Sequence, residues 1–261
     1  MRTTKRSTPT DAFYPIVALA LAALAWEAVT RLTATPAYAL PAPTAVVQEL
    51  IRQWPLLLHN TLSTTVAIIA GFLLSVFGGI ALALLITNWR VCEKTLYPLL
   101  IGSQAIPKLA LAPLFVVWFG YGLLPKVLMT FLIAVFPVVV STVQGISSVE
   151  TELEFLARSM GLGAYRTFLM IRLHRALPSI FAGLKVAITL AVVGAVVGEF
   201  VGSDRGLGTL LLRAIGVMNT PLLFAGLVVL TALAIVLFAA IELLELMAIP
   251  WHVSQRSRWT R

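Results

Sequence analysis

The stretch Asn60–Ile86 reads NTLSTTVAIIAGFLLSVFGGIALALLI and decides the fold class of this chain. It lies within a longer run, Pro55–Trp89, that contains no Asp, Glu, Lys or Arg. A helix needs about 20 apolar residues to cross a bilayer, so this run is long enough for one span. Its apolar residues surround the helix instead of forming one stripe, and they do not alternate as in the strands of a membrane barrel. The stretch therefore predicts a transmembrane helix.

The whole chain has the composition of an integral membrane protein. Of its 261 residues, 59% are hydrophobic and 11% are charged, and the mean hydropathy is +0.96. A soluble domain is roughly 45–50% apolar and about 25% charged, so these values exclude a soluble globular protein. They also exclude a disordered chain, which needs low hydrophobicity and high charge. We expect an all-α integral membrane fold with six transmembrane helices, at 12–32, 60–87, 97–119, 124–146, 180–202 and 223–247.

Basic residues set the expected orientation. The chain carries 19 Lys and Arg against 11 Asp and Glu, a net charge of +8. In a membrane protein this excess marks cytoplasmic loops, and most of it falls inside if both termini are cytoplasmic. We expect cytoplasmic tails at 1–11 and 248–261, and a first transmembrane helix with an external amphipathic segment at 12–59. The core at 60–247 includes a cytoplasmic loop at 147–180.

The external segment leaves two alternatives open. Thr44–Trp54 has the spacing of an amphipathic helix, which would lie on the membrane surface or contact an external partner. Pro36–Ala39 reads PAYA and resembles a signal-peptide cleavage site, but it lies more than ten residues beyond Trp26, farther than such sites usually lie. We therefore expect the first helix to be retained, whereas cleavage would leave five spans.

The third span is interrupted by proline and by charge. Pro107 and Lys108 fall in its middle. A charge at membrane depth normally faces a cavity or a partner, and irregular backbone is tolerated there where it lines a pathway. We therefore interpret Lys108 and Pro107 as residues of a translocation pathway. Glu199 is interpreted as a partner of Lys108 or as a further pathway residue, and the alternative is a place at the external interface beside Asp204 and Arg205.

The loop 147–180 predicts two helices that meet at Gly161–Gly163. Glu154 and Arg158 stand four residues apart in the first helix, which is the spacing of a helical ion pair. The second helix is expected to end before Pro178, because proline lacks a backbone N–H. Both helices are too apolar for an ordinary solvated loop, so the loop is a candidate docking site for another protein.

Motifs for chemistry are missing from the sequence. The chain has no G-x-x-x-x-G-K-[ST] nucleotide loop, no H-E-x-x-H motif and no G-x-S-x-G motif. Its three histidines, His59, His174 and His252, fall in separate regions. We also find no repeat of one half in the other, such as many secondary transporters carry. We interpret the chain as a non-enzymatic transport subunit that needs a second copy and an external motor, and the alternative is a stand-alone secondary transporter or channel.

The stretch 155–178, FLARSMGLGAYRTFLMIRLHRALP, resembles the EAA loop of bacterial ABC-importer permeases. That pattern is roughly E-A-A-x-x-x-G, followed later by I-x-L-P. Ala157 and Gly161 match its first half, while the leading acid falls on Phe155 and is lost or supplied by Glu154. The resemblance implies a set of ATPase-coupling residues: Glu154, Phe155, Ala157, Arg158, Gly161, Ile171, Leu173 and Pro178.

Further stretches resemble one subfamily, the nitrate/sulfonate/taurine/bicarbonate permeases. They are Ile106–Leu114 with Trp118–Gly120, Gly198–Phe200 with Gly206–Gly208, Met218–Pro221 and Ile249–His252. The resemblance covers about 45–255. That subfamily also serves thiamine-precursor pyrimidines, aromatic carboxylates and riboflavin-like compounds, so it does not single out one solute.

This resemblance implies a type I ABC importer (MetI-like) permease fold in the bacterial inner membrane. Two permease copies would surround the pathway, and two cytoplasmic ATPase subunits, which bind ATP and Mg²⁺, would grip the loops. A periplasmic or lipid-anchored binding protein would deliver the solute, which would cross by alternating access. The chain itself would bind lipid but no cofactor, metal or nucleic acid. The expected solute is a small anion of the sulfonate, taurine, nitrate, aromatic carboxylate or vitamin-precursor class.

Overall fold

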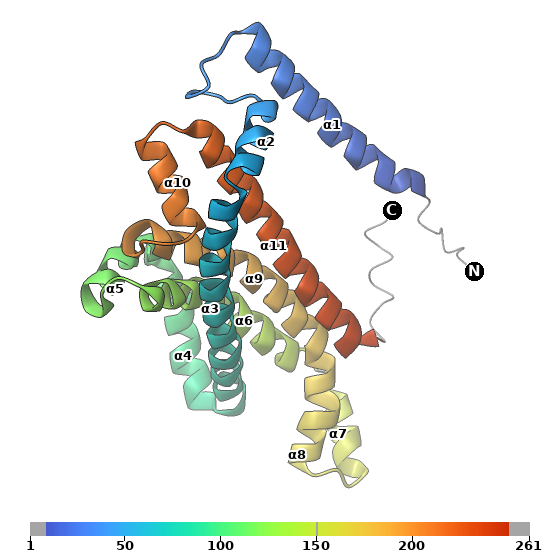
Figure 1. Ribbon diagram of the computed structural model, residues 1–261. Helices are drawn as coiled ribbons and strands as arrows, with labels where there is room; N and C mark the ends of the chain where they lie inside the picture. Colours follow the sequence, from blue (N-terminus) through green and yellow to red (C-terminus); the bar gives the residue numbers. More distant parts are fainter. Residues whose placement is uncertain (1–8, 150, 251–261) are drawn as a thin grey trace.

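The computed structural model describes residues 9–149 and 151–250, and every regular element in them is a helix (Figure 1). The elements follow the chain in this order: α1 (Pro9–Leu32), α2 (Pro43–Arg52), α3 (Trp54–Asn88), α4 (Arg90–Gly102), η1 (Ser103–Ala105), η2 (Lys108–Leu111), α5 (Ala112–Phe119), α6 (Leu123–Ser147), α7 (Thr151–Ser159), α8 (Ala164–Thr167), the π-helical η3 (Phe168–Leu173), α9 (His174–Gly202), α10 (Leu207–Gly216) and α11 (Thr220–Ala248).

The helices α3, α6 and α9 form the core, and small residues let them approach closely. A Cβ added to Gly194 of α9 would lie 2.7 Å from the Cα of Thr130 on α6. A Cβ on Gly79 of α3 would lie 2.8 Å from a methyl carbon of Val138, also on α6. Small residues at such contacts are typical of membrane helices, because lipid supplies no hydrophobic force between spans. A cluster of buried apolar residues from α3, α6, α9 and α11 fills the space among them.

Four helices in the described part of the chain are long and apolar enough to cross a membrane: α3, α6, the run α8–η3–α9, and α11. Counted as one broken span, Arg90–Ala105 and Lys108–Phe119, which meet at 89°, make a fifth. The break falls at Pro107, where the sequence predicts it. The first predicted span, at 12–32, corresponds to α1, which stands apart from the core (Figure 1) and meets α11 through rings 5.5 Å apart, Trp26 and Phe224. The count of six spans stays a prediction.

The helix expected to end before Pro178 continues through it, so that prediction is wrong. The π-helical η3 leads directly into α9, and Pro178 lies inside α9. Membrane helices tolerate proline where side chains or local π geometry satisfy the freed backbone groups.

One end of the bundle is closed by α2 and α10. The short helix predicted at 44–54 is present as α2, and it packs against α11. The sequence predicts no helix between the fifth and sixth spans, yet α10 lies there in contact with α3, α9 and α11. Its Leu207 and Leu210 are buried with Val46 of α2, Leu57 of α3 and Leu222 of α11. A search for membrane spans passes over α10, because 10 residues are too few to span a bilayer.

Candidate functional site

The first candidate site is the hairpin of α7 and α8, which projects from the end of the bundle opposite α2 (Figure 1). Gly161 turns the chain with φ of +78°, a left-handed conformation that favours glycine. The backbone N–H of Leu162 donates to the carbonyl of Ala157 at 3.0 Å, the bond that defines a Schellman helix ending. Ala157 is buried beneath this turn. The expectation of two helices that meet at Gly161–Gly163 is confirmed.

Large apolar side chains cover the outer surface of this hairpin. Phe155 and Tyr165 are 67% and 75% exposed, and Leu156, Met160 and Met170 are exposed as well. Exposed apolar groups of this size typically mark a contact surface for another molecule. The hairpin therefore presents an exposed apolar surface at one end of the helical bundle.

The remaining loop residues connect the hairpin to the core. Leu173 packs against the buried cluster that joins α6 and α9, and Ile171 and Pro178 are half-buried. Their position makes them the base of the hairpin and not part of its outer surface. The side chains of Glu154 and Arg158 lie outside the described residues, so their ion pair stays a prediction.

The second candidate site lies at the broken span. Lys108 opens η2, directly after the exposed Pro107. Its ammonium donates a hydrogen bond to Gln104 Oε1 at 2.7 Å and lies 5.8 Å from the ring centre of Phe136 on α6. An ammonium at that distance is attracted to the face of an aromatic ring. The site thus combines a cation, an amide and a ring beside a break in the helix.

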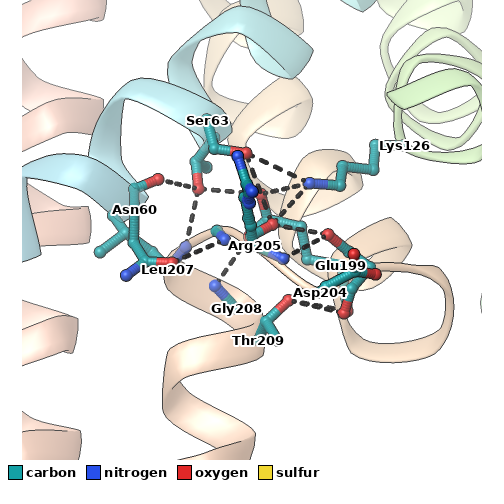
Figure 2. A network of polar contacts seen from close by, with 12 residues as sticks. Asn60, Ser63, Lys126, Glu199, Asp204, Arg205, Leu207, Gly208 and Thr209 are labelled. Atoms are coloured by element: carbon teal, nitrogen blue, oxygen red, sulfur yellow. Dashed lines mark hydrogen bonds and ion pairs between the residues drawn. The ribbon is translucent and has the colours of Figure 1, made fainter. Parts of the chain in front are cut away.

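The structure pairs Glu199 with Lys126 and not with Lys108 (Figure 2). Glu199 is 1% exposed, and its Oε1 lies 3.6 Å from Lys126 Nζ. Lys126 also donates to the carbonyl of Arg205 at 2.6 Å. Glu199 is therefore found beside the 204–205 turn, which is the predicted alternative, and its carboxylate is enclosed within one chain. The interpretation of Glu199 as a partner of Lys108 is wrong, because its carboxylate is instead held by Lys126 of α6, Thr64 of α3 and Gly208 of α10.

Three side chains accept the backbone N–H groups where α10 begins: Asn60 from Gly206, Thr64 from Leu207, and Glu199 from Gly208, at 2.8, 2.8 and 2.7 Å. The first N–H groups of a helix have no partner within the helix, and a negative charge there is favourable. The hydroxyl of Thr64 also donates to Glu199 at 2.9 Å. We call the four residues Asn60, Thr64, Lys126 and Glu199 the α10 clasp.

Gly206 completes the geometry of the clasp. Its φ is +133°, and a Cβ at this position would collide with the carboxylate of Glu199. A side chain is therefore excluded both by the backbone conformation and by the space. The turn before α10 can approach Glu199 only because residue 206 is glycine.

Sequence reasoning missed Lys126, Asn60 and Thr64. One signal was present, because Asn60 and Thr64 are polar residues four apart in an apolar helix and so share one face. Lys126 carries no comparable signal, since it stands next to the start of a span, where basic residues are common. The described residues hold no group of three or more His, Cys, Asp and Glu that could bind a metal ion.

The comparisons with known proteins fit this architecture. Residues 75–246 match the family model for the binding-protein-dependent transport system inner membrane component. The chain is 39% identical to the formylaminopyrimidine transport permease protein ThiX of Halalkalibacterium halodurans, over 94% of this chain and 98% of that protein. It is 37% identical to the riboflavin transport system permease protein RibX of Chloroflexus aurantiacus, over 91% and 90%. It is 28% identical to the taurine transport system permease protein TauC of Escherichia coli, over 90% and 88%.

A solved structure shares the fold. A chain of the inward-facing MetNI methionine ABC transporter superposes with a TM-score of 0.64 at 18% identity, covering 74% of this chain and 96% of that chain. The family match runs from inside α3 into α11 and so includes the broken span, the hairpin, and Lys126 and Glu199 of the clasp. Together with relatives that align along nearly their whole length, this match shows that the chain belongs to the binding-protein-dependent transport system inner membrane components, as the permease subunit of an ABC importer and not as an enzyme.

Proposed function

We propose that this permease imports a small nitrogen-containing ring compound of the vitamin-precursor class. The observation that carries the proposal is the 39% identity to a formylaminopyrimidine permease over 98% of its length. A riboflavin permease is 37% identical, whereas a putative aliphatic sulfonate permease reaches 31% and the taurine permease 28%. The formylaminopyrimidine and riboflavin permeases are both named for flat, nitrogen-rich rings.

The broken span supports this choice of solute. Lys108, Gln104 and Phe136 form a cation, an amide and a ring within reach of one another. A flat ring with carbonyl and amino groups can stack on an aromatic side chain and exchange hydrogen bonds with an amide. Pro107 and Lys108 are the pathway residues of this proposal, while Glu199 lies in the clasp.

Two copies of the chain would enclose this pathway. Ile106 and Leu109, on either side of the break, are 51% and 64% exposed in the single chain. A cation facing lipid at that depth is costly, whereas a second copy facing Lys108 would place it in a polar pathway. The partner proposed for this surface is therefore another copy of the same chain.

The α7–α8 hairpin would contact the ATPase subunits. In this arrangement the hairpin end is cytoplasmic, both termini are cytoplasmic, and the α2–α10 end faces the external binding protein. The ATPase subunits would bind ATP and Mg²⁺, so that the energy reaches the chain through the exposed surface around Phe155 and Tyr165. The predicted coupling residues, from Glu154 to Pro178, then form the surface that contacts the ATPase subunits and the base of the hairpin that carries it.

The test is uptake by the complete complex. The chain would be reconstituted in proteoliposomes with its ATPase and binding-protein partners, and supplied with labelled formylaminopyrimidine, riboflavin or taurine. We expect ATP-dependent accumulation of a ring compound and none of taurine. Accumulation of taurine alone would overturn the solute class. Uptake at full rate without the ATPase subunits would favour the stand-alone transporter and overturn the proposal.

A further inference from the structure

One uninterrupted helical run connects the α7–α8 hairpin with the opposite end of the molecule. The segment Tyr165–Gly202 is a single run of 38 residues, about 55 Å long at roughly 1.5 Å per residue. In Figure 1 the hairpin lies at the lower end of this run and α10 lies near its upper end. A rigid element of this kind can carry a displacement from one end to the other.

The clasp fastens α10 to the far end of that run. Glu199 lies three residues before the end of α9 and accepts the N–H of Gly208 in α10. Lys126 of α6 and Asn60 of α3 take part in the same network (Figure 2). Thr64, also on α3, accepts the N–H of Leu207. Four helices therefore meet at one buried carboxylate.

A buried charge pair is an expensive way to obtain stability alone. The side chains of Lys126 and Glu199 are 4% and 0% exposed, and well-packed apolar side chains often stabilise such a position as well or better. What the charged pair adds is a requirement for particular partners in a particular geometry. The carboxylate must meet the N-terminus of α10, and the ammonium must meet both the carboxylate and the carbonyl of Arg205.

We infer that Glu199 and Lys126 are positioning residues for transport: they make α10 move with α9 as one body. A shift of the hairpin would then move α10 at the external end. This inference rests on the proposed function, in which the hairpin contacts the ATPase subunits. The outer side of α10 is not packed against the rest of the chain, so α10 can move with α9, since Leu212 and Ile215 are 40% and 56% exposed.

The experiment measures the coupling and the position of α10 in the same complex. Spin labels are placed at Val193 on α9 and Ile215 on α10, both exposed, in a Cys92→Ser background because Cys92 is the one native cysteine. Labelled chain is diluted with unlabelled chain, so that only distances within one copy contribute. We expect a narrow distance distribution in the otherwise wild-type chain.

Glu199→Gln and Lys126→Met should broaden that distribution and lower the solute molecules moved per ATP hydrolysed by about tenfold. The matched control is Arg31→Gln, which removes an exposed ion pair with Glu27 (2.6 Å) and should change neither value. If Glu199→Gln does not assemble, Thr64→Val carries the same test, because it removes the acceptor of the Leu207 N–H and keeps the charge pair.

The outcomes separate this inference from the proposed function. A lower melting temperature with unchanged stoichiometry and unchanged distances would make the clasp merely structural and overturn the inference. A complex with wild-type sequence that takes up no ring compound, or binds no ATPase subunit, would overturn the proposed function instead. Both the inference and the proposed function are supported if the wild-type complex takes up the ring compound while Glu199→Gln shows a broadened distance distribution and moves fewer solute molecules per ATP.

Discussion

Lys185 on α9 and Glu245 on α11 form an ion pair, with 2.6 Å between Nζ and Oε2. Both residues lie in apolar helices that are long enough to cross a membrane, where each charge alone would be costly. Their side chains are 23% and 11% exposed. The pair therefore ties the helix that leads to the hairpin to the last span.

Removing one partner of this pair should destabilise the chain. Because the pair is partly exposed, we expect Lys185→Met to lower the free energy of unfolding by about 1–3 kcal/mol. The double variant with Glu245→Gln should recover part of that loss. Thermal unfolding of the purified chain measures it, with Glu242→Gln on the same helix as the control. Equal melting temperatures for Lys185→Met and the wild type would contradict the prediction.

Gly161→Pro should disrupt the hairpin, because proline holds φ near about −65° and residue 161 requires +78°. We expect insertion into the membrane to be retained and uptake to fall more than about tenfold, a change equivalent to ~1.4 kcal/mol. Gly163→Ala is the matched control, since a Cβ there meets nothing within 4 Å and its backbone is not left-handed. Uptake at the wild-type rate in Gly161→Pro would refute the role of the hairpin in coupling.

Lys108→Met should impair passage of the solute without impairing assembly. The substitution removes the charge near Phe136 and the hydrogen bond to Gln104. We expect uptake at a fixed concentration of binding protein to fall about tenfold, while Lys108→Arg, which keeps the cation above the ring, stays within about threefold. Equal uptake by Lys108→Met and the wild type would remove Lys108 from the pathway.

Gly206→Ala should destabilise the α10 end of the chain. An alanine there is strained by the φ of +133°, and its Cβ would collide with the carboxylate of Glu199. We expect a loss of about 2–4 kcal/mol from strain and overpacking. Gly216→Ala, at the other end of α10, meets nothing within 4 Å and should leave the melting temperature unchanged or slightly raised.

Local sequence was sufficient for the features that depend on neighbouring residues. The apolar run around Asn60–Ile86 predicts α3, and the pair Pro107–Lys108 predicts the break in the third span. Gly161 predicts the joint of the hairpin, because a left-handed residue at a helix end is a local requirement. Pro178 gave a wrong prediction, because α9 continues through it.

The sequence by itself determined that this chain lives in a membrane, where its helices are interrupted, and to which family it belongs. Only the tertiary structure decided which charges meet. Lys126 and Glu199 are 73 positions apart, and Lys185 and Glu245 are 60 apart. Pairing over such separations depends on the depth and rotation of each helix, which close contacts such as that of Gly194 with Thr130 set. No local sequence pattern predicts those contacts, so the pairing of Glu199 with Lys126 and the contacts of α10 with the clasp depend on how the helices pack.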